Sequence, residues 1–359
     1  MIQSKSKSMV LKVFFVGISL FLFSGMWSDP VEAAKPIKMR FAWPVTQGHP
    51  MTAPVQAWLK ELQEASNGAV VIEFHGAEAL GKAPEYGDLV REGLADMALF
   101  TCAYNPAQYQ MTRFLELPFA TTSSRISYEV GKALLDKKLI SSEFEQFKLL
   151  IHTPSPPTHL FSNKNITKAE DFKGIRVMGM GPVWNKTMDL LGAQCVTMNM
   201  QDVYLALQRG TLDAGVTNFA SVMGYKWVEV AQHPIDISLM GGYFSIFIMN
   251  NKSWSKLTPE VQAAWSKINA KHAQIFYSIF DKFEVVGRSK WPEAGKELTV
   301  FPAEEKEKLA KTLTPVWQDW IDRMEKDGKP GKEIYKTYVA TMKKIGEPVV
   351  IKVPGLYEN

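Results

Sequence analysis

The run between Asp171 and Asn218 constrains the fold more than any other part of the chain. It reads as strand, helix, strand, helix and strand, and its first strand is apolar and β-branched on either side of a central arginine. Strands that alternate with helices in this way form parallel sheets covered by helices. The run therefore predicts an α/β unit that carries a positive charge within its first strand.

That charge belongs to Arg176, which lies between Ile175 and Val177 and is followed by Gly179 and Gly181. An unpaired buried guanidinium is costly, so the side chain must reach a partner or an open cleft. In one interpretation Arg176 clamps the carboxylate of a ligand. In the other it extends to solvent at the end of the strand. The local sequence leaves both interpretations open.

Residues 1–33 have the features of a secretory signal peptide. Three lysines precede an apolar run from Val13 to Phe23, and small residues at Val31 and Ala33 indicate cleavage after Ala33. The apolar run has 11 residues, against the roughly 20 that span a bilayer. We therefore expect export and cleavage rather than an uncleaved anchor. We also expect a soluble mature protein, in which Met240–Met249 is a buried strand.

Length and charge narrow the class of protein further. About 326 residues follow Ala33, which is more than one comfortable hydrophobic core and predicts two domains. The formal net charge of the whole chain is +4, and its Lys and Arg are interspersed with acids, so we expect no nucleic-acid partner. Cys102 and Cys195 are predicted in different lobes, and we expect both to be free and mostly buried.

An earlier run repeats the same organisation. It predicts strands at Ile37–Trp43, Ala69–Phe74 and Asp96–Phe100, with helices at Met51–Ala65 and Pro84–Glu92. The second helices of the two runs end alike, in LVREGLADMAL and ALQRGTLDAGV. A coincidence between two ordinary loops is the alternative to a true repeat.

The shared residues of the repeat have a structural explanation. Gly93 and Gly210 can adopt the left-handed conformation that ends a helix, and Asp96 and Asp213 can fix the following turn by local hydrogen bonds. A true repeat predicts two α/β lobes that face each other across a cleft. Ligands of such sheets bind at the carboxyl ends of the strands.

The last third of the chain is predicted to be helical. Thr258 and Pro259 begin a long helix to about Arg288, and two more helices are expected at 303–327 and 332–344. Trp317, Trp320 and Met324 recur at helical spacing, which indicates packing rather than chemistry.

Motifs for catalysis or cofactor binding are missing from the sequence. Gly179-Met180-Gly181 lacks the rest of a nucleotide fingerprint, and no GxSxG, HExxH or Cys/His ligand spacing occurs. We therefore expect no catalytic residue, no metal site and no cofactor. A binding protein is favoured over an enzyme.

Several motifs in order resemble the solute-binding proteins of tripartite ATP-independent periplasmic (TRAP) transporters. FKGIRV and LGAQCVTMNMQDVYLALQRGTLDAGV are similar to the second lobe of that family, and FAWPVTQGHP and ASNGAVVIEFHGAEALGK to the first. NNKSWSKLTPEVQAAW also matches. The resemblance spans essentially the whole chain after residue 33. It implies a two-lobed periplasmic receptor that delivers an organic acid to separate membrane subunits.

The resemblance also assigns residues to the site. It makes Arg176 the carboxylate clamp and places either Thr217 or Asn218 at the family's asparagine position, while His159 stands where a second arginine often lies. Strand-end residues add a soft, aromatic lining that suits an aromatic or apolar monocarboxylate or 2-oxo acid, with a ring held between Trp43 and Phe219. The expected lining residues are Trp43, Tyr104, Met178, Trp184, Phe219 and Tyr243.

The predicted architecture is a class II-like binding protein whose long helix and C-terminal helices pack across both lobes. The first lobe is expected at 34–157 and the second at 158–250, with strands that cross between them near 155–165 and 240–250. The helical part is expected at 251–359. We expect a periplasmic monomer. The alternatives are a receptor that feeds a signalling partner and, less favoured, a secreted hydrolase or lyase.

Overall fold

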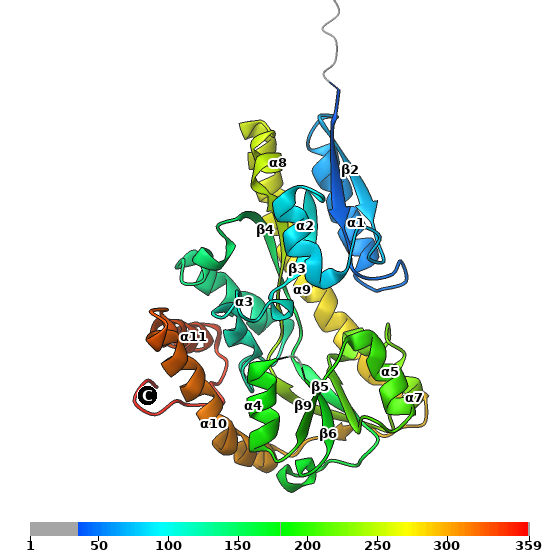
Figure 1. Ribbon diagram of the computed structural model, residues 1–359, viewed down its shortest axis with the longest axis vertical. Helices are drawn as coiled ribbons and strands as arrows, with labels where there is room; N and C mark the ends of the chain where they lie inside the picture. The colour runs from blue at the N-terminus through cyan, green and yellow to red at the C-terminus, as the bar shows by residue number, and fades with distance from the viewer. Residues whose placement is uncertain (1–34, 180, 358–359) are drawn as a thin grey trace, which may run out of the picture. The chain divides into compact units, whose positions relative to one another are not determined.

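A computed structural model describes residues 35–179 and 181–357, so the predicted signal peptide lies outside the described residues. Two β-sheets organise the described chain (Figure 1). The first sheet has the order β2 (Val70–His75), β1 (Ile37–Ala42), β3 (Met97–Thr101), β10 (Phe244–Asn250) and β4 (Phe147–Pro154). The second has the order β11 (Thr299–Val300), β9 (His233–Met240), β5 (Thr158–Ser162), β8 (Ala214–Thr217), β6 (Arg176–Gly179) and β7 (Gln194–Thr197).

Each sheet has a parallel part built from one of the two predicted runs. In the first sheet β1 pairs in parallel with β2 and β3, and in the second β6 pairs in parallel with β7 and β8. The antiparallel strands are β10, which pairs with β3 and β4, and β5, which pairs with β8 and β9. The two-sheet α/β architecture expected from the sequence is therefore confirmed.

Helices cover the sheets. Those of the first four-fifths of the chain are α1 (Thr52–Glu64), α2 (Tyr86–Glu92), α3 (Ser124–Asp136), α4 (Pro182–Leu190), α5 (Met200–Gln208), α6 (Phe219–Val222), α7 (Trp227–Val230), α8 (Asn251–Ser255) and α9 (Pro259–Glu293). The C-terminal helices are α10 (Ala303–Lys326) and α11 (Gly331–Ile345). Short 3-10 helices lie at Ala83–Glu85, Cys102–Tyr104, Thr112–Glu116, Ser141–Phe144 and Ala169–Phe172. In the described part of the chain, no helix has the length and apolar character that a membrane span requires.

The long helix α9 packs against elements of both sheets. It begins as predicted, with the Thr258 hydroxyl accepting a hydrogen bond from the backbone N of Val261 at 3.4 Å. It contacts β4 of the first sheet and α6, which follows β8 of the second. It also continues five residues beyond the predicted end at Arg288. The extension includes Trp291, which is fully buried and stacks on Phe161 with ring centroids 5.3 Å apart.

The chain crosses between the sheets at residues 155–157 and 241–243, which corrects the prediction of one continuous strand from Met240 to Met249. Strand β9 ends at Met240 and β10 begins at Phe244. Two glycines make the second crossing possible. A Cβ added to Gly241 would lie 1.9 Å from the carbonyl oxygen of Leu115, and one added to Gly242 would lie 2.0 Å from that of Ser155. The two crossings are therefore in direct backbone contact, which only glycine permits.

The repeat between the two lobes has a structural basis. Gly93 and Gly210 have φ of +76° and +66°, as expected for left-handed helix ends. The aspartates act differently from the prediction of local bonds. Asp96 accepts a hydrogen bond from the backbone N of Arg40 at 2.8 Å, and Asp213 accepts the same bond from Arg176 at 2.8 Å. Each aspartate therefore binds the first strand of its own run.

Packing interactions account for the conspicuous residues of the C-terminal part and for the cysteines. Trp317, Trp320 and Met324 are buried, and the Trp317 indole donates to the carbonyl oxygen of Pro118 at 2.9 Å. This confirms their predicted packing role. Cys102 is buried and Cys195 half-buried, and both are free thiols.

Candidate functional site

A cavity of about 160 Å³ lies between the strand ends of the two sheets. From the first sheet it is lined by the residues after β1 and at the ends of β3 and β4, and from the second by those at the end of β8. The second crossing, α5 and α9 complete the wall. Because the carboxyl ends of parallel strands gather at this place, it is where the fold is expected to bind a ligand.

Several residues that line the cavity are aromatic. They include Trp43, Phe247, Phe280 and Tyr104, which lies just after β3. Trp43 is held in place because its indole donates to the Thr52 hydroxyl at 2.9 Å and stacks on Phe247 with centroids 6.2 Å apart. These planar faces suit a flat, apolar ligand body.

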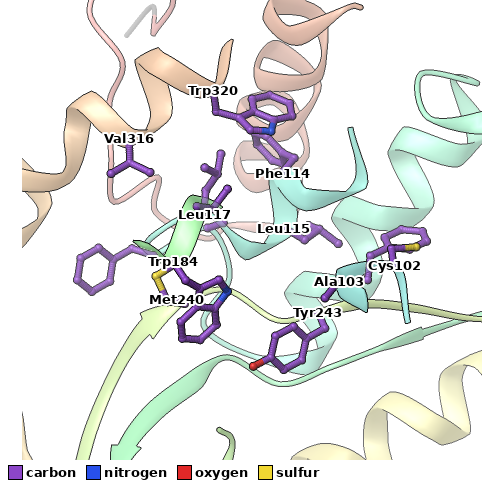
Figure 2. Close-up of a cluster of buried hydrophobic side chains, with 14 of the residues drawn as sticks. Cys102, Ala103, Phe114, Leu115, Leu117, Trp184, Met240, Tyr243, Val316 and Trp320 are labelled. Carbon is purple, nitrogen blue, oxygen red and sulfur yellow. The ribbon is translucent and has the colours of Figure 1, made fainter. Parts of the chain in front are cut away.

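Other residues of the lining carry hydroxyl groups. Thr153 and Ser155 follow one another at the end of β4, Thr217 ends β8, and Tyr243 lies in the second crossing. The Tyr243 ring stacks on the Trp184 indole with centroids 6.2 Å apart and planes inclined by 19°. Figure 2 shows these two rings side by side, with the Tyr243 hydroxyl at the outer edge of the buried cluster. The stacking therefore fixes the Tyr243 ring.

The cavity wall is electrically neutral over the described residues. None of the residues that line it is Lys, Arg, Asp or Glu. His49 is the one imidazole of this wall, and burial lowers its pKa to about 4, so the ring is uncharged at pH 7. Burial likewise raises the pKa of Tyr243 well above its usual value, so its hydroxyl keeps its proton. A ligand in the cavity therefore meets polar but uncharged groups.

Five of the ten residues predicted for the site lie in this cavity. Trp43, Tyr104, Thr217, Asn218 and Tyr243 all line it. The sequence left open whether Thr217 or Asn218 faces the ligand, and the structure brings both to the wall. Their side chains differ in one respect. The Asn218 amide oxygen already accepts from the backbone N of Ser221 at 2.8 Å, whereas the Thr217 hydroxyl has no hydrogen-bond partner among the described residues.

Arg176, the expected carboxylate clamp, is not part of the cavity wall. It is the first residue of β6, on a level with Asp213 in the pairing of β6 with β8. Thr217 lies four residues further along β8, or roughly 13 Å at the rise of a strand. The guanidinium instead binds both carboxylate oxygens of Asp213, each at 2.9 Å. A side chain at the amino end of its strand cannot serve a site at the carboxyl ends.

His159 and Phe219 also lie outside the cavity wall. His159 is fully buried and its Nδ1 lies 2.9 Å from a carboxylate oxygen of Asp236. Phe219 packs on this imidazole with ring centroids 4.7 Å apart, and the guanidinium carbon of Arg288 lies 4.5 Å from the centre of the Phe219 ring. The expected sandwich of a ligand ring between Trp43 and Phe219 therefore does not agree with the structure.

Met178 and Trp184 support the site without lining it. Met178 is 1 % exposed and packs in the apolar cluster of the second sheet, because it points to the covered face of β6. Trp184 is 1 % exposed and lies behind Tyr243. Both were expected at the surface of the cavity, and both are one layer too deep.

Sequence reasoning missed Thr153, Ser155 and Ser245. Strands β4 and β10 are antiparallel to each other, so the end of β4 and the start of β10 meet at the cavity. Ligands are expected at the carboxyl ends of strands, which is where Thr153 and Ser155 lie, whereas Ser245 lies at the amino end of β10. The hydroxyl-rich stretch HTPSPP was the signal for the first two.

Comparisons with known proteins identify the family. The model of the family described as bacterial extracellular solute-binding protein, family 7, matches residues 41–323. The chain belongs to this family. It is a solute-binding protein of the TRAP transporter type, which confirms the resemblance noted in the sequence. Members of the family are receptors rather than enzymes.

Similar proteins bind different acids. The chain is 24% identical over 295 residues to the C4-dicarboxylate-binding periplasmic protein DctP of Rhodobacter capsulatus, which covers 81% of this chain and 88% of that protein. A TRAP solute binding protein of an unidentified marine microbe, specific for aromatic acid ligands and bound to metahydroxyphenylacetate, has a TM-score of 0.79 at 23% identity and covers 86% and 99% of the two chains. A TRAP solute binding protein of Rhodoferax ferrireducens with copurified benzoate has a TM-score of 0.79 at 19% identity. The match covers 86% of this chain and 98% of that chain. At these identities the structural likeness shows the shared fold.

Proposed function

We propose that the protein captures a small organic acid with an aromatic or apolar body in the cavity between its sheets and delivers it to the membrane subunits of a TRAP transporter. The observation that carries the proposal is that aromatic rings and hydroxyl groups line the same cavity. The rings bury the ligand body, and the polar groups of the wall receive its acid group.

A ligand with one ring fits within the cavity. An apolar cavity of roughly 150 Å³ accommodates benzene, and this cavity has about 160 Å³. Sugar acids and dicarboxylates fit less well, because each further hydroxyl or carboxylate needs hydrogen-bond partners beyond those that receive the first acid group. Two structural neighbours are complexes with aromatic acids. The dicarboxylate-binding relative is the contrary case.

The cell compartment is part of the proposal. The family is extracellular by description, and residues 1–33 carry the features of a cleaved signal peptide. We propose that the mature protein begins after Ala33 and works in the periplasm. N-terminal sequencing of the exported protein tests this point, and an intact N-terminus in the membrane fraction contradicts it.

Calorimetry on ligand-free mature protein tests the ligand class. The protein is unfolded and refolded to remove any copurified ligand, and is then titrated with phenylacetate, phenylpyruvate, indole-3-acetate, pyruvate and succinate. We expect the aromatic acids to bind more tightly than pyruvate and succinate. Saturation at 100 times Kd stabilises the fold by about 2.7 kcal/mol, so melting curves give a second measurement. Tighter binding of succinate or pyruvate contradicts the ligand class, and binding of none of the five contradicts the capture of an organic acid of this kind.

A further inference from the structure

One face of α9 runs from the cavity to α6. Phe280 lines the cavity, and Glu284 and Gly287 follow it at helical spacing, so the three residues share a face of the helix. Glu284 and Gly287 are both buried. The short helix α6 directly follows Thr217 and Asn218 of the cavity wall. The long helix therefore reaches the turn that carries part of this wall.

Two contacts hold α6 against this face of α9. A carboxyl oxygen of Glu284 accepts a hydrogen bond from the backbone N of Ala220 at 2.8 Å, in a buried position. A Cβ added to Gly287 would lie 2.0 Å from the carbonyl oxygen of Phe219. The backbones of the two helices therefore touch at this point, which glycine permits because it has no side chain. These two residues of α9 thus fix the place of α6.

The start of α6 also belongs to the cavity wall. Asn218 and Ser221 both line the cavity. The Asn218 amide oxygen accepts from the backbone N of Ser221 at 2.8 Å, and its amide N donates to the Ser155 hydroxyl of the first crossing at 3.5 Å. A helix of four residues leaves its first N–H groups without partners of its own, so side chains supply them. A shift of α6 therefore moves Asn218 in the wall.

Charged groups of the second sheet surround Glu284. Its other carboxyl oxygen lies 3.2 Å from Nη1 of Arg288 and 3.7 Å from Nε2 of His159. Asp236 binds both of these residues. Burial raises the pKa of Glu284 to about 7, so the group is mainly protonated at pH 5. An uncharged substitution measured at pH 5 therefore changes the hydrogen bond to α6 and leaves the charge of this residue nearly the same.

We infer that Glu284 is a positioning residue for ligand binding, because its bond to Ala220 holds α6, and with it Asn218, in place at the cavity wall. This inference rests on the proposed function and adds to it a residue outside the cavity. Glu284 itself does not line the cavity. Its effect on a ligand must therefore pass through the short helix that it holds.

Two variants of Glu284 differ in whether they keep the acceptor. Glu284→Gln keeps an amide oxygen for Ala220, and Glu284→Leu has no acceptor. Both are titrated with phenylacetate by calorimetry at pH 5, as ligand-free mature protein. We expect Glu284→Gln to bind within about twofold of the parent and Glu284→Leu about tenfold more weakly, the equivalent of one ordinary hydrogen bond. Glu284→Asn, whose amide is one carbon shorter, carries the same expectation and replaces Glu284→Leu if that variant does not fold.

Asp281 is the matched control on the same helix. One of its carboxylate oxygens accepts from the backbone N of Ser124 at 3.0 Å, at the start of α3. None of the residues of α3 lines the cavity. Asp281→Asn and Asp281→Leu are expected to bind phenylacetate equally, although Asp281→Leu melts earlier. A loss of affinity in Asp281→Leu as large as that in Glu284→Leu would show that any weakened helix start lowers the affinity, and it overturns the inference.

Hydrogen exchange measured by mass spectrometry follows α6 in the absence of ligand. We expect the segment 217–222 to exchange about tenfold faster in Glu284→Leu than in Glu284→Gln, because a lost local bond lowers local protection. The segment 97–101, which forms β3, is expected to exchange at the same rate in both variants. Equal exchange of 217–222 in the two variants overturns the inference.

The results separate the inference from the proposed function. Equal affinity of Glu284→Leu and Glu284→Gln for phenylacetate overturns the inference while the proposed function stands. Failure of the parent to bind any of the acids overturns the proposed function and with it the role of Glu284 in binding. Faster exchange of 217–222 in Glu284→Leu would in that case still show that Glu284 fixes α6.

Discussion

The Arg176 guanidinium and the Asp213 carboxylate form a two-point ion pair, with Nε and Nη2 each donating to a different carboxylate oxygen at 2.9 Å. Nη2 also donates to the carbonyl oxygen of Gly210 at 2.7 Å. The hydrogen bonds from Arg176 hold the pKa of Asp213 below its usual value. One side chain thus joins the start of β6 to the end of α5 and the turn into β8.

The first lobe contains a related arrangement. Arg40 in β1 donates its backbone N to Asp96 and its guanidinium to the carbonyl oxygen of Gly93, both at 2.8 Å. The arginine, the glycine and the aspartate therefore recur together in the two halves. This shared pattern explains the strand arginine as part of the repeated framework, and the cavity lies at the opposite ends of the strands.

Replacement of Arg176 is therefore expected to leave ligand binding intact. Arg176→Gln removes the two-point contact to Asp213 and is expected to lower the melting temperature modestly. The affinity for phenylacetate is expected to stay within about twofold of the parent, the usual range for a surface change away from the site. Calorimetry measures the affinity and a melting curve the stability.

Arg40→Gln is the matched control in the first lobe. It removes the corresponding contact to Gly93, so the same pattern of results is expected from it. If Arg176→Gln alone lost tenfold or more in affinity, Arg176 would contribute to ligand binding. That result would contradict a purely structural role for the residue.

The order of strands and helices was predictable because local signals agree with the tertiary structure. The alternating runs and the helix ends at Gly93 and Gly210 lie where the sequence indicates. The end of α9 was not predictable from local signals. The helix continues past Arg288 because Trp291 finds a buried place against Phe161, and that contact joins residues 130 positions apart.

The site was predictable only in part, for a geometric reason. Thr217 and Asn218 follow β8, and their place was found by the rule of carboxyl strand ends. Arg176 was misplaced because a strand of four residues has its two ends only a few residues apart, and the sequence does not show which residue is first. The structure shows that β6 begins at Arg176.

The contact between the two crossings is expected to tolerate no side chain at Gly242. In Gly242→Ala the added Cβ would lie 2.0 Å from the carbonyl oxygen of Ser155, so the backbone of one crossing must move. We expect a loss of about 3 kcal/mol in the free energy of unfolding, at the upper end for overpacking. Urea denaturation measures it. Gly48→Ala is the control, because an added Cβ there has nothing within 4 Å, and an equal loss in both variants would contradict the steric explanation.

Tyr104 is the best residue at which to test whether the aromatic residues of the cavity wall contact the ligand. It lines the cavity and is 38 % exposed, so its truncation disturbs the core little. Tyr104→Ala is expected to weaken phenylacetate binding by about 1 kcal/mol, or roughly fivefold, through loss of an aromatic contact. Leu94→Ala changes a side chain that is 51 % exposed and does not line the cavity, and it should leave the affinity unchanged. Tyr104→Ala with the affinity of the parent would contradict the use of this wall.

The buried charges next to α6 predict how stability depends on pH. Glu284 lies one helical turn after the cavity residue Phe280 on α9, accepts from the backbone N of Ala220 at 2.8 Å, and lies 3.2 Å from Arg288. His159 and Asp236 complete the group. Burial raises the pKa of Glu284 to about 7. Burial lowers the pKa of His159. This makes the free energy of unfolding rise with pH, whereas the raised pKa of Glu284 makes it fall.

The sign of the Glu284 effect follows from the raised pKa. The folded protein keeps a proton that the unfolded chain releases near its ordinary pKa of about 4.5, so the stabilising contribution is complete below that pH. It is lost as the pH rises through about 7 and amounts to on the order of 3 kcal/mol. Glu284→Gln removes this titration and keeps an acceptor for Ala220. The stability of the variant relative to the parent is therefore expected to increase from pH 5 to pH 8, as measured by urea denaturation.

A control on the same helix separates this effect from general charge. Glu293 is an exposed residue at the end of α9 that pairs with Lys290. Its side chain is not buried, so Glu293→Gln is expected to differ from the parent by nearly the same amount at pH 5 and pH 8. The contribution of His159 cancels when Glu293→Gln is compared with the parent, whereas His159 Nε2 lies 3.7 Å from a Glu284 carboxylate oxygen, so the Glu284→Gln difference includes the effect of that change on His159. A difference between Glu284→Gln and the parent that is constant from pH 5 to pH 8 would show that Glu284 ionises normally and that Arg288 offsets its burial.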